Sequence, residues 1–330
     1  MRDKIISILR EHIGSPLSGE EISKKILISR TAVWKHIRQL KQAGYDIQAV
    51  NKKGYILSAL PDLVLPGEIT SCLATRWLGR NIIYRGSVKS TNDIAKQAAL
   101  EGCPHGTVIV AEEQSGGRGR LARGWFSPLH RGLWFSVVLR PPFLPQEAPK
   151  LTLLMAVVLA EALAVYPGVQ TGIKWPNDIL LQGKKISGIL TEMSAEMEAI
   201  NYVVIGTGLN TNTPEEILPV NLREKAGSLN DFAALPVSRA RLLSGILAAL
   251  EKIYDETIKS GFIPVLKRWR EYSVTLGRKV RVDAPDESFA GEAVDIDETG
   301  ALLVRRASGK LEKVLAGDVS VRTADGEGYI

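Results

Sequence analysis

Positive charge is concentrated in the first sixty residues of this 330-residue chain. Residues 1–60 hold 11 lysines and arginines against 5 acidic residues, whereas the remainder holds 31 of each, so the formal net charge of +6 belongs to one short segment. Residues 59–67, with prolines at 61 and 66, then predict a stiff linker. We therefore expect a small basic domain, residues 1–62, ahead of a larger remainder. A local basic excess is typical of a surface that contacts a polyanion, and a solvated basic surface is the alternative.

Three helices are expected in this basic segment. Apolar residues at helical spacing predict the first helix over residues 3–12. Residues 18–21, Ser-Gly-Glu-Glu, have the capping-box pattern that opens a second, short helix. Ser29 is placed to cap a third helix over residues 30–43, and Gly44 is placed to end it.

A basic hairpin is expected after the third helix. Residues 47–50 and 55–57 predict two strands, and the turn between them carries two lysines. A basic hairpin tip beside a helix-turn-helix resembles the wing of a winged helix, which contacts the phosphate backbone. The alternative is a small helical packing domain with an ordinary charged surface. We predict DNA as the partner, and the residues expected to contact it are Ser29, Arg30, Thr31, Lys35, Arg38, Lys52 and Lys53.

Residues 63–272 have the mixed strand and helix pattern of an α/β domain. Residues 90–93, Ser-Thr-Asn-Asp, are expected to open a helix over 94–101. The apolar run 151–166 predicts a buried helix, because it is too short and too interrupted for a membrane span. The expected strands in the first half of this domain are 82–84, 107–111 and 132–139.

Residues 114–125, Gln-Ser-Gly-Gly-Arg-Gly-Arg-Leu-Ala-Arg-Gly-Trp, intersperse glycines with arginines. Such a segment does not form a continuous helix or strand, so we predict a mobile cationic loop that folds onto a phosphate or carboxylate. A solvated flexible loop is the alternative. The spacing of Gly117, Gly119 and Ala122 fits the loose dinucleotide fingerprint, but no amphipathic helix follows, and the chain contains no P-loop sequence. Any ATP site is therefore of another kind.

Further polar groups flank later apolar runs. Residues 174–178, Lys-Trp-Pro-Asn-Asp, lie between a helix and an apolar segment, and Lys184-Lys185 stand at the start of a predicted strand. Basic side chains in such places suit a bound anion, and ordinary turn chemistry is the alternative. Residues 203–210 predict a strand running into a Gly-x-Gly-x-Asn turn.

These motifs, in this order and spacing, resemble the biotin–protein ligase family over about residues 65–270. With the N-terminal winged helix, the chain is similar to the bifunctional members, which double as repressors of the biotin operon. This resemblance implies operator DNA as the partner of the first domain. Lipoate ligases share the fold but lack the Gly-Arg-Gly-Arg and Lys-Trp-Pro-Asn-Asp signatures. Leu121 and Ala122 depart from the more basic stretch that many members have there. The motifs that carry the resemblance are Ser90-Thr91-Asn92, Gln114, residues 117–120, residues 174–178, Lys185 and Gly206-x-Gly-x-Asn210.

The resemblance implies a reaction and its partners. Family members make biotinyl-5'-AMP from biotin and ATP with Mg²⁺, releasing pyrophosphate. They then transfer biotin to a lysine of the biotin carboxyl carrier protein of acetyl-CoA carboxylase. In the bifunctional members the adenylate also serves as corepressor, and we expect a homodimer when the adenylate is bound. We also expect a cytoplasmic protein with no membrane partner.

The resemblance also assigns roles to residues. Trp125 either offers a flat face to adenine or is a core tryptophan. No metal site is expected from the protein alone, because Mg²⁺ would enter with ATP. Catalytic roles fall to Arg120, Lys174, Asp178 and Lys185. Biotin contacts fall to Ser90, Thr91, Asn92, Gln114, Arg118, Gly119, Arg120, Lys185 and Gly188, and nucleotide contacts to Arg118, Arg120, Arg123, Trp125, Lys174, Asn177 and Asn210.

Residues 273–330 show short strand patterns separated by turns, which predict a small β domain. The resemblance makes it an SH3-like barrel. The expected fold class is therefore a multidomain α/β (α+β) protein: a winged helix-turn-helix over 1–62, a class II synthetase-like biotin ligase catalytic domain over 63–272, and the barrel.

Two other functions remain open at this level. A sensor-repressor would join the winged helix to a metabolite-binding domain without catalysis, but Lys174, Lys185 and the arginine loop argue against it, because a sensor needs no phosphate electrostatics. A lipoate-type acyl ligase would use the same fold on another acid. The two cysteines, Cys72 and Cys103, are too few for a disulfide framework, and we expect free thiols.

Overall fold

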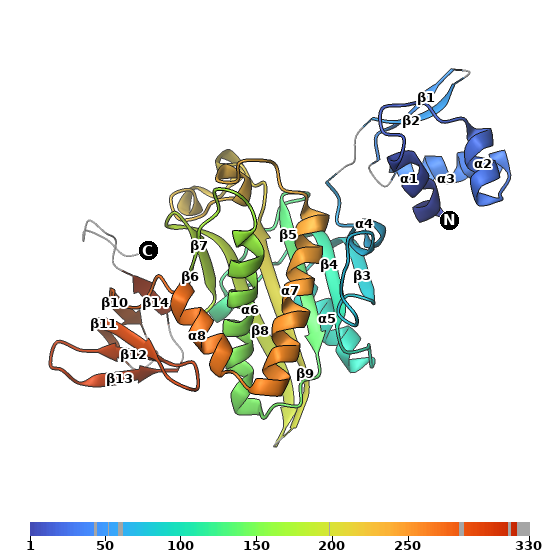
Figure 1. Cartoon of the computed structure of the whole chain (residues 1–330). Coiled ribbons are helices and arrows are strands. Elements are labelled where there is room, and N and C mark those ends of the chain that lie inside the picture. Colours follow the sequence, from blue (N-terminus) through green and yellow to red (C-terminus); the bar gives the residue numbers. More distant parts are fainter. Residues whose placement is uncertain are drawn as a thin grey trace. The chain divides into compact units, whose positions relative to one another are not determined.

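The computed structural model describes residues 1–42, 45–51, 53–58, 62–197, 199–283, 287–315 and 318–321. They belong to two compact units, Met1–Leu63 and Val64–Ile330, which are described separately (Figure 1). The predictions for Gly44 and Lys52 lie outside the described residues. The domain bounds given above stay predictions.

The first unit has the helices and the hairpin expected from its sequence. The capping box is formed: the hydroxyl of Ser18 accepts from the N–H of Glu21 at 3.1 Å, and the Glu21 carboxylate accepts from the N–H of Ser18 at 2.9 Å. Ser29 Oγ accepts from the N–H of Ala32 at 3.2 Å and so caps the third helix. The elements are α1 (Arg2–Arg10), α2 (Gly19–Ile26), α3 (Arg30–Gln42), β1 (Ile47–Val50) and β2 (Gly54–Leu57).

The hairpin is fixed to the helices by its backbone. Leu17 and Tyr55 each donate a backbone hydrogen bond to the other's carbonyl at 2.9 Å. Gly54 adopts φ +106°, and a Cβ there would overlap the Leu17 carbonyl, so this approach requires glycine. The core beneath consists of buried apolar side chains, Ile5, Leu9, Ile22, Val33, Ile37, Leu40, Ile47 and Leu57.

The predicted linker ends earlier than expected. Helix α4 (Pro66–Thr70) begins inside residues 59–67, of which 59–61 lie outside the described residues. The prolines favoured a linker prediction, but Pro66 stands at the start of α4, where a missing N–H breaks no helical hydrogen bond.

A seven-stranded sheet forms the centre of the second unit. Its order is β3-β4-β5-β9-β8-β7-β6, with β3 and β4 parallel and the other neighbours antiparallel. The strands are β3 (Ile82–Val88), β4 (Thr107–Gln114), β5 (Gly132–Leu139), β6 (Thr171–Lys174), β7 (Asp178–Leu181), β8 (Lys184–Glu196) and β9 (Ala199–Asn210).

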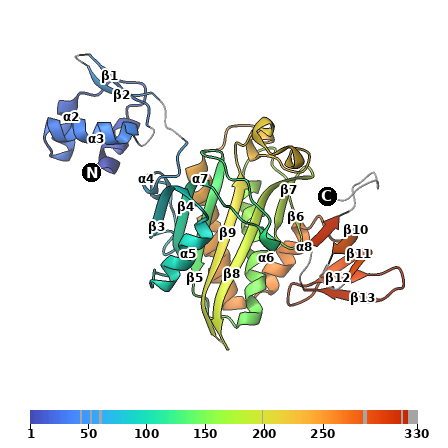
Figure 2. The same ribbon diagram turned by 180° about the vertical axis from the view of Figure 1, so that it is seen from behind.

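Helices cover both faces of this sheet. Figures 1 and 2 show α6 (Ala148–Ala164) and α7 (Arg239–Ser260) against one face and α5 (Thr91–Leu100) against the other. Most of α6 is buried, as its apolar run predicted, and α8 (Ile263–Tyr272) packs beside it. Within the described residues, no helix is both long and apolar enough to cross a membrane. Short 3₁₀ turns lie at Arg120–Ala122, Pro145–Glu147, Glu215–Ile217, Val220–Leu222 and Leu229–Asp231.

A five-stranded antiparallel sheet closes the second unit, in the order β13-β12-β11-β10-β14. Its core joins that of the central sheet. Trp175 holds the two together: its indole N–H donates to the Gly300 carbonyl at 3.0 Å, and its backbone N–H donates to Thr275 Oγ1 at 2.9 Å. The strands are β10 (Lys279–Asp283), β11 (Ser288–Ile296), β12 (Leu302–Arg305), β13 (Leu311–Val314) and β14 (Asp318–Val321).

A buried carboxylate on β4 joins several segments. Glu112, 1% exposed, accepts from Arg239 Nη1 at 2.8 Å and from the backbone N–H of Val64 at 2.9 Å, and His130 Nδ1 lies 3.0 Å from the same carboxylate. Arg239 is fully buried at the start of α7 and also donates to the Gly132 carbonyl. Glu112 therefore fixes the first residue of the unit, the start of α7 and the loop before β5.

Arg239→Ala is expected to destabilise this unit by about 3–5 kcal/mol, because it leaves the Glu112 carboxylate buried without its charged partner. Urea unfolding followed by tryptophan fluorescence measures the change. The control is Arg305→Ala, which removes a pair with Glu292 that is more than half exposed and should cost less than about 1 kcal/mol. Equal costs for the two variants would contradict the structural importance of the buried pair.

Candidate active site

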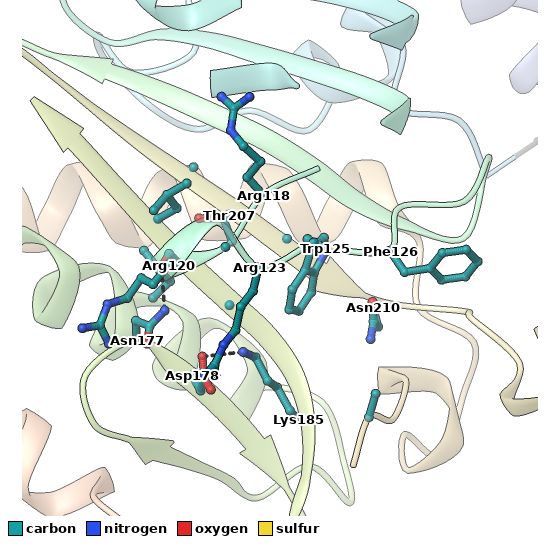
Figure 3. Close-up of a pocket in the computed structure, with 18 of the residues that line it drawn as sticks. Arg118, Arg120, Arg123, Trp125, Phe126, Asn177, Asp178, Lys185, Thr207 and Asn210 are labelled. Atoms are coloured by element: carbon teal, nitrogen blue, oxygen red, sulfur yellow. Dashed lines mark hydrogen bonds and ion pairs between the residues drawn. The ribbon is translucent and has the colours of Figure 1, made fainter. Parts of the chain in front are cut away.

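A cavity of about 520 Å³ lies between the sheet and the loop 114–127. Side chains from this loop, β7, β8 and β9 converge on it (Figure 3), and residues of α5 and β4 also line it. The structure brings together every ligase-site residue expected from the sequence, and this set lines the cavity: Ser90, Thr91, Asn92, Gln114, Arg118, Gly119, Arg120, Arg123, Trp125, Lys174, Asn177, Asp178, Lys185, Gly188 and Asn210.

A network of uncharged polar groups forms one end of the cavity. The Thr91 N–H donates to Gln114 Oε1 at 2.8 Å, and Gln114 Nε2 donates to Ser127 Oγ at 3.0 Å. Buried Ser136 on β5 lies 2.6 Å from Asn92 Oδ1 and 2.8 Å from Thr91 Oγ1. These contacts fix which amide atoms of Gln114 and Asn92 donate and which accept.

Asn92 is held from its other side by an ion pair. Its Nδ2 donates to Glu192 Oε2 at 2.7 Å, and Glu192 Oε1 accepts from Lys96 at 2.8 Å. The hydrogen bond to Glu192 and burial act in opposite directions on the pKa of Lys96, and the hydrogen bond prevails and raises it. The Asn92 amide is therefore oriented by residues that do not line the cavity.

The loop 114–127 is folded back on itself in the structure. Two isolated antiparallel bridges pair Arg118 with Gly124 and Gln114 with Ser127, and the Trp125 N–H donates to the Gly117 carbonyl at 2.8 Å. At the tip, Leu121 and Ala122 adopt φ of +53° and +56°, a region that non-glycine residues enter at a cost. The two positions that depart from the family pattern are thus the strained ones.

Arg118 points away from Arg120, Arg123 and Lys185 (Figure 3). Its guanidinium forms a bidentate pair with the Asp93 carboxylate on α5, with one N–H···O distance of 3.0 Å. This hydrogen bonding lowers the pKa of Asp93. Arg118 fastens the loop to α5, and its assignment to biotin and nucleotide stays a prediction.

The other cations gather at the opposite end of the cavity. Lys185 Nζ lies 2.7 Å from Asp178 Oδ1 and 5.3 Å from the centre of the Trp125 ring. Arg123 also points toward Asp178 in Figure 3, and Arg120 Nη1 donates to Asn177 Oδ1 at 3.4 Å. Among the described lining residues, six are cationic (Arg118, Arg120, Arg123, Lys174, Lys185 and Lys225) and one, Asp178, is acidic, so the cavity suits an anion.

Glycines on β8 and β9 let two site side chains lie directly on the sheet. A Cβ at Gly206 would overlap the Asn92 amide, and a Cβ at Gly208 would overlap the Trp125 indole, which also lies 3.0 Å from the Cβ position of Gly188. The Gly-x-Gly-x-Asn segment was predicted as a turn, and that prediction is wrong. β9 runs straight to Asn210, and the glycines permit close packing rather than a bend.

Sequence reasoning missed the far wall of the cavity. Lys225 and its neighbours lie in the irregular segment after β9. This segment is held at the site because the Lys185 N–H donates to the Lys225 carbonyl at 2.7 Å. No motif marks this segment, because its contribution depends on a backbone pairing. The lining residues not assigned from the sequence are Phe126, Leu180, Thr207, Leu218, Leu222, Lys225, Ala226 and, from β14, Ser320, together with Leu121, Gly124, Gly183, Leu190, Gly206 and Gly208.

The fold and the site define a protein with a helix-turn-helix domain and an α/β domain built to hold an anionic ligand. Residues 84–210 match the model of the biotin/lipoate A/B protein ligase family, residues 2–56 that of an HTH domain, and residues 275–322 that of the biotin protein ligase C-terminal domain.

Relatives match over the whole length. The chain is 38% identical to the bifunctional ligase/repressor BirA of Bacillus spizizenii, covering 97% of this chain and 98% of that one, and 31% identical to BirA of Escherichia coli, covering 98% and 97%. The structure of the Aquifex aeolicus biotin protein ligase in complex with biotin and ATP aligns with a TM-score of 0.63 at 27% identity, covering 74% of this chain and all of that one. The chain belongs to the biotin protein ligase family, with the architecture of its bifunctional ligase/repressors.

Gly208→Ala is expected to push the Trp125 indole off β9. It should change the near-ultraviolet circular dichroism of tryptophan and destabilise the unit by about 1–3 kcal/mol, because the added methyl group overlaps the ring. Gly245→Ala on α7 is the control, since a Cβ there meets nothing within 4 Å and alanine favours the helix. An unchanged tryptophan signal in Gly208→Ala would show that Trp125 does not lie on this strand.

Proposed function

We propose that this chain activates biotin with ATP to biotinyl-5'-AMP and transfers biotin to a lysine of a biotin carboxyl carrier protein. The observation that carries the proposal is one cavity whose uncharged polar end, around Thr91 and Gln114, continues into a group of cations around Lys185. A neutral polar ring fits the first end and two reacting anions the second. The structure of the Aquifex aeolicus relative contains biotin and ATP, which are of these two kinds.

The first step joins two anions. A carboxylate oxygen of biotin attacks the α-phosphorus of ATP, an acyl–phosphate bond forms, and pyrophosphate leaves with the electron pair of the broken P–O bond. Cations lower the repulsion between the carboxylate and the phosphates and stabilise the charge that develops. Lys185 and Arg120 are assigned to the reacting carboxyl and phosphate groups, and Lys174 to the phosphates. Asp178 pairs with Lys185 at 2.7 Å, and a bound anion would compete for that lysine.

The ureido ring of biotin is assigned to the uncharged end. Its carbonyl and two N–H groups need donors and acceptors in fixed places, and a buried site that leaves one of them unpaired loses affinity. We assign these groups to Ser90, Thr91, Asn92 and Gln114. Asn92 accepts from Ser136 and donates to Glu192, and Gln114 donates to Ser127, so the orientation of both amides is fixed. Gly119 and Gly188 also line the cavity and are assigned to biotin.

The nucleotide is assigned to the cavity around Trp125. The indole N–H of Trp125 has no hydrogen-bond partner among the described residues, although it is buried. This fits a ring that faces the nucleotide, and the same indole packs on Gly208 of β9. The amides of Asn177 and Asn210 donate to the carbonyls of Ile189 and Gly227, at 2.9 and 3.1 Å. Asn177 Oδ1 accepts from Arg120 at 3.4 Å, and we assign Asn210 Oδ1 as an acceptor toward the nucleotide.

Mg²⁺ would accompany the ATP phosphates and neutralise part of their charge. Asp178 is the carboxylate that lines the described part of the cavity, and one carboxylate together with phosphate oxygens suits this ion. In the transfer step the amine of the carrier lysine attacks the acyl carbon, and AMP leaves. We assign Asp178 to orient that amine. A loop that closes over the cavity would limit hydrolysis of the mixed anhydride.

We further propose that the chain represses biotin-synthesis genes, with the adenylate as corepressor and a homodimer as the DNA-binding form. Arg30, Thr31, Lys35 and Arg38 are exposed along α3, and Lys53 is exposed at the hairpin tip, as a winged helix on DNA requires. Ser29 caps α3, so any contact of this residue with DNA adds to that role. Folding of the loop 114–127 onto the adenylate would favour the dimer.

Biotin-dependent release of pyrophosphate from Mg-ATP tests the ligase proposal. Lys185→Ala should lower the rate roughly 100-fold or more, because it removes a cation from the reacting anions. Lys184→Ala is the matched control, since that lysine pairs with Glu215 at 3.4 Å and does not line the cavity. Release with lipoate instead of biotin would favour a lipoate-type ligase, and release with neither acid would favour a sensor-repressor.

Gly117→Ala should uncouple dimer formation from adenylate synthesis. A Cβ at Gly117 would lie 2.6 Å from the Trp125 carbonyl and 2.8 Å from Ser127 Oγ, so the loop cannot fold as described. Sedimentation with biotin and Mg-ATP measures the dimer fraction, and bound adenylate is measured in the same sample. Equal dimer fractions in the variant and the parent at equal adenylate content would contradict the coupling.

A further inference from the structure

One exposed row of side chains on α3 contains a large apolar residue. The row consists of Arg30, Thr31, Trp34, Lys35, Arg38 and Lys41, all exposed. Trp34 is 54% exposed, although a tryptophan usually covers most of its surface within a fold. Its neighbours in the row are cations and one threonine.

The packing of the first unit does not account for this tryptophan. The inward stripe of α3 consists of Val33, Ile37 and Leu40, which are 0%, 3% and 4% exposed. Trp34 follows Val33 by one position and lies four residues from both Arg30 and Arg38, so it faces outward with them. The Arg38 guanidinium lies 5.9 Å from the centre of the Trp34 ring, within reach of a cation–π contact.

The occupant that matches this face is the major groove of duplex DNA. The charge of the row is complementary to phosphate, and all of the chain's net positive charge lies in the first sixty residues. The N-terminal half of a recognition helix contacts base edges, and Trp34 is the fifth of the 13 residues of α3. The apolar group on base edges in that groove is the thymine 5-methyl.

We propose that Trp34 is a specificity-determining residue that packs on the 5-methyl group of a thymine, with Arg38 stacked on the far side of its ring reaching a phosphate or a guanine. The proposal rests on the DNA-binding function proposed above. It distinguishes Trp34 from the cations of the row, because their phosphate contacts carry affinity for any duplex whereas a methyl contact carries sequence preference.

The probe is a duplex selected from a random pool by the parent chain in the presence of biotin and Mg-ATP. Each thymine of that duplex is then replaced in turn by deoxyuridine, which lacks only the methyl group. We expect at least one replacement per half-site to weaken binding by the parent roughly five- to tenfold. Trp34→Ala should bind the parent duplex more weakly by a similar factor and be insensitive to that same replacement.

Three controls separate this role from others. Ile13→Ala removes another exposed apolar side chain of the same unit, 45% exposed, and should keep the parent's pattern. Lys35→Ala should reduce the salt dependence of binding by about one ion while keeping the deoxyuridine sensitivity, whereas Trp34→Ala should leave the salt dependence unchanged. The thermal midpoint and the pyrophosphate release of Trp34→Ala should equal those of the parent, because the side chain is exposed.

The outcomes are distinguishable. If the parent selects no duplex, the DNA-binding proposal fails and this one fails with it. If the parent selects a duplex and Trp34→Ala binds it with the parent's affinity and deoxyuridine sensitivity, the thymine contact alone is overturned. A Trp34→Ala variant that loses pyrophosphate release or dimer formation would instead place this side chain against the α/β unit or a second copy, which also overturns the proposal.

Discussion

The site depends on the absence of side chains at Gly206 and Gly208 on β9 and at Gly188 on β8. These positions face the cavity at the centre of the sheet, where any Cβ would overlap or crowd Asn92 or Trp125. Since the two glycines on β9 are two residues apart, they face the same side, and they place the amide and the indole side by side. A strand normally loses stability when it contains glycine, yet both glycines of β9 lie in the part that is paired with β5 on one side and β8 on the other, which offsets that loss.

A second constraint connects the site to the rest of the unit through β4. This strand carries the buried Glu112. Two residues later it carries Gln114, which belongs to the uncharged polar end of the cavity. Because Glu112 holds Arg239 of α7 and the backbone of Val64, the register of β4 is fixed. Gln114 therefore has a defined place before any ligand arrives, and the pre-organisation of its hydrogen bonds is a consequence of packing elsewhere.

The sequence was sufficient to predict two kinds of feature: those whose physical cause is local, and the group of motifs that resembles a single family site. The capping box at Ser18 was predicted because its atoms lie within one turn, and the ligase motifs were expected together because they resemble one family site. The partnership of Arg118 with Asp93 was not predictable, since an arginine in a glycine-rich loop suits a phosphate and a carboxylate equally. Glycines in β9 were misread as a turn for a similar reason: a glycine marks either a bend or a close approach, and only the position of Trp125 decides between them.

The two functions proposed for this chain use charge in different ways. In the first sixty residues the excess of cations acts collectively: a polyanion releases condensed counterions on binding, so affinity follows ionic strength steeply. The remainder has equal numbers of cations and acids, and its site cations lie beside partners such as Asp178 and Asp93 in a partly enclosed cavity. Charges in such surroundings are screened much less by salt. A change in ionic strength therefore acts far more on DNA binding than on adenylate formation, and the segregation of charge along the sequence allows one chain to keep its enzymatic activity while its occupancy of DNA varies.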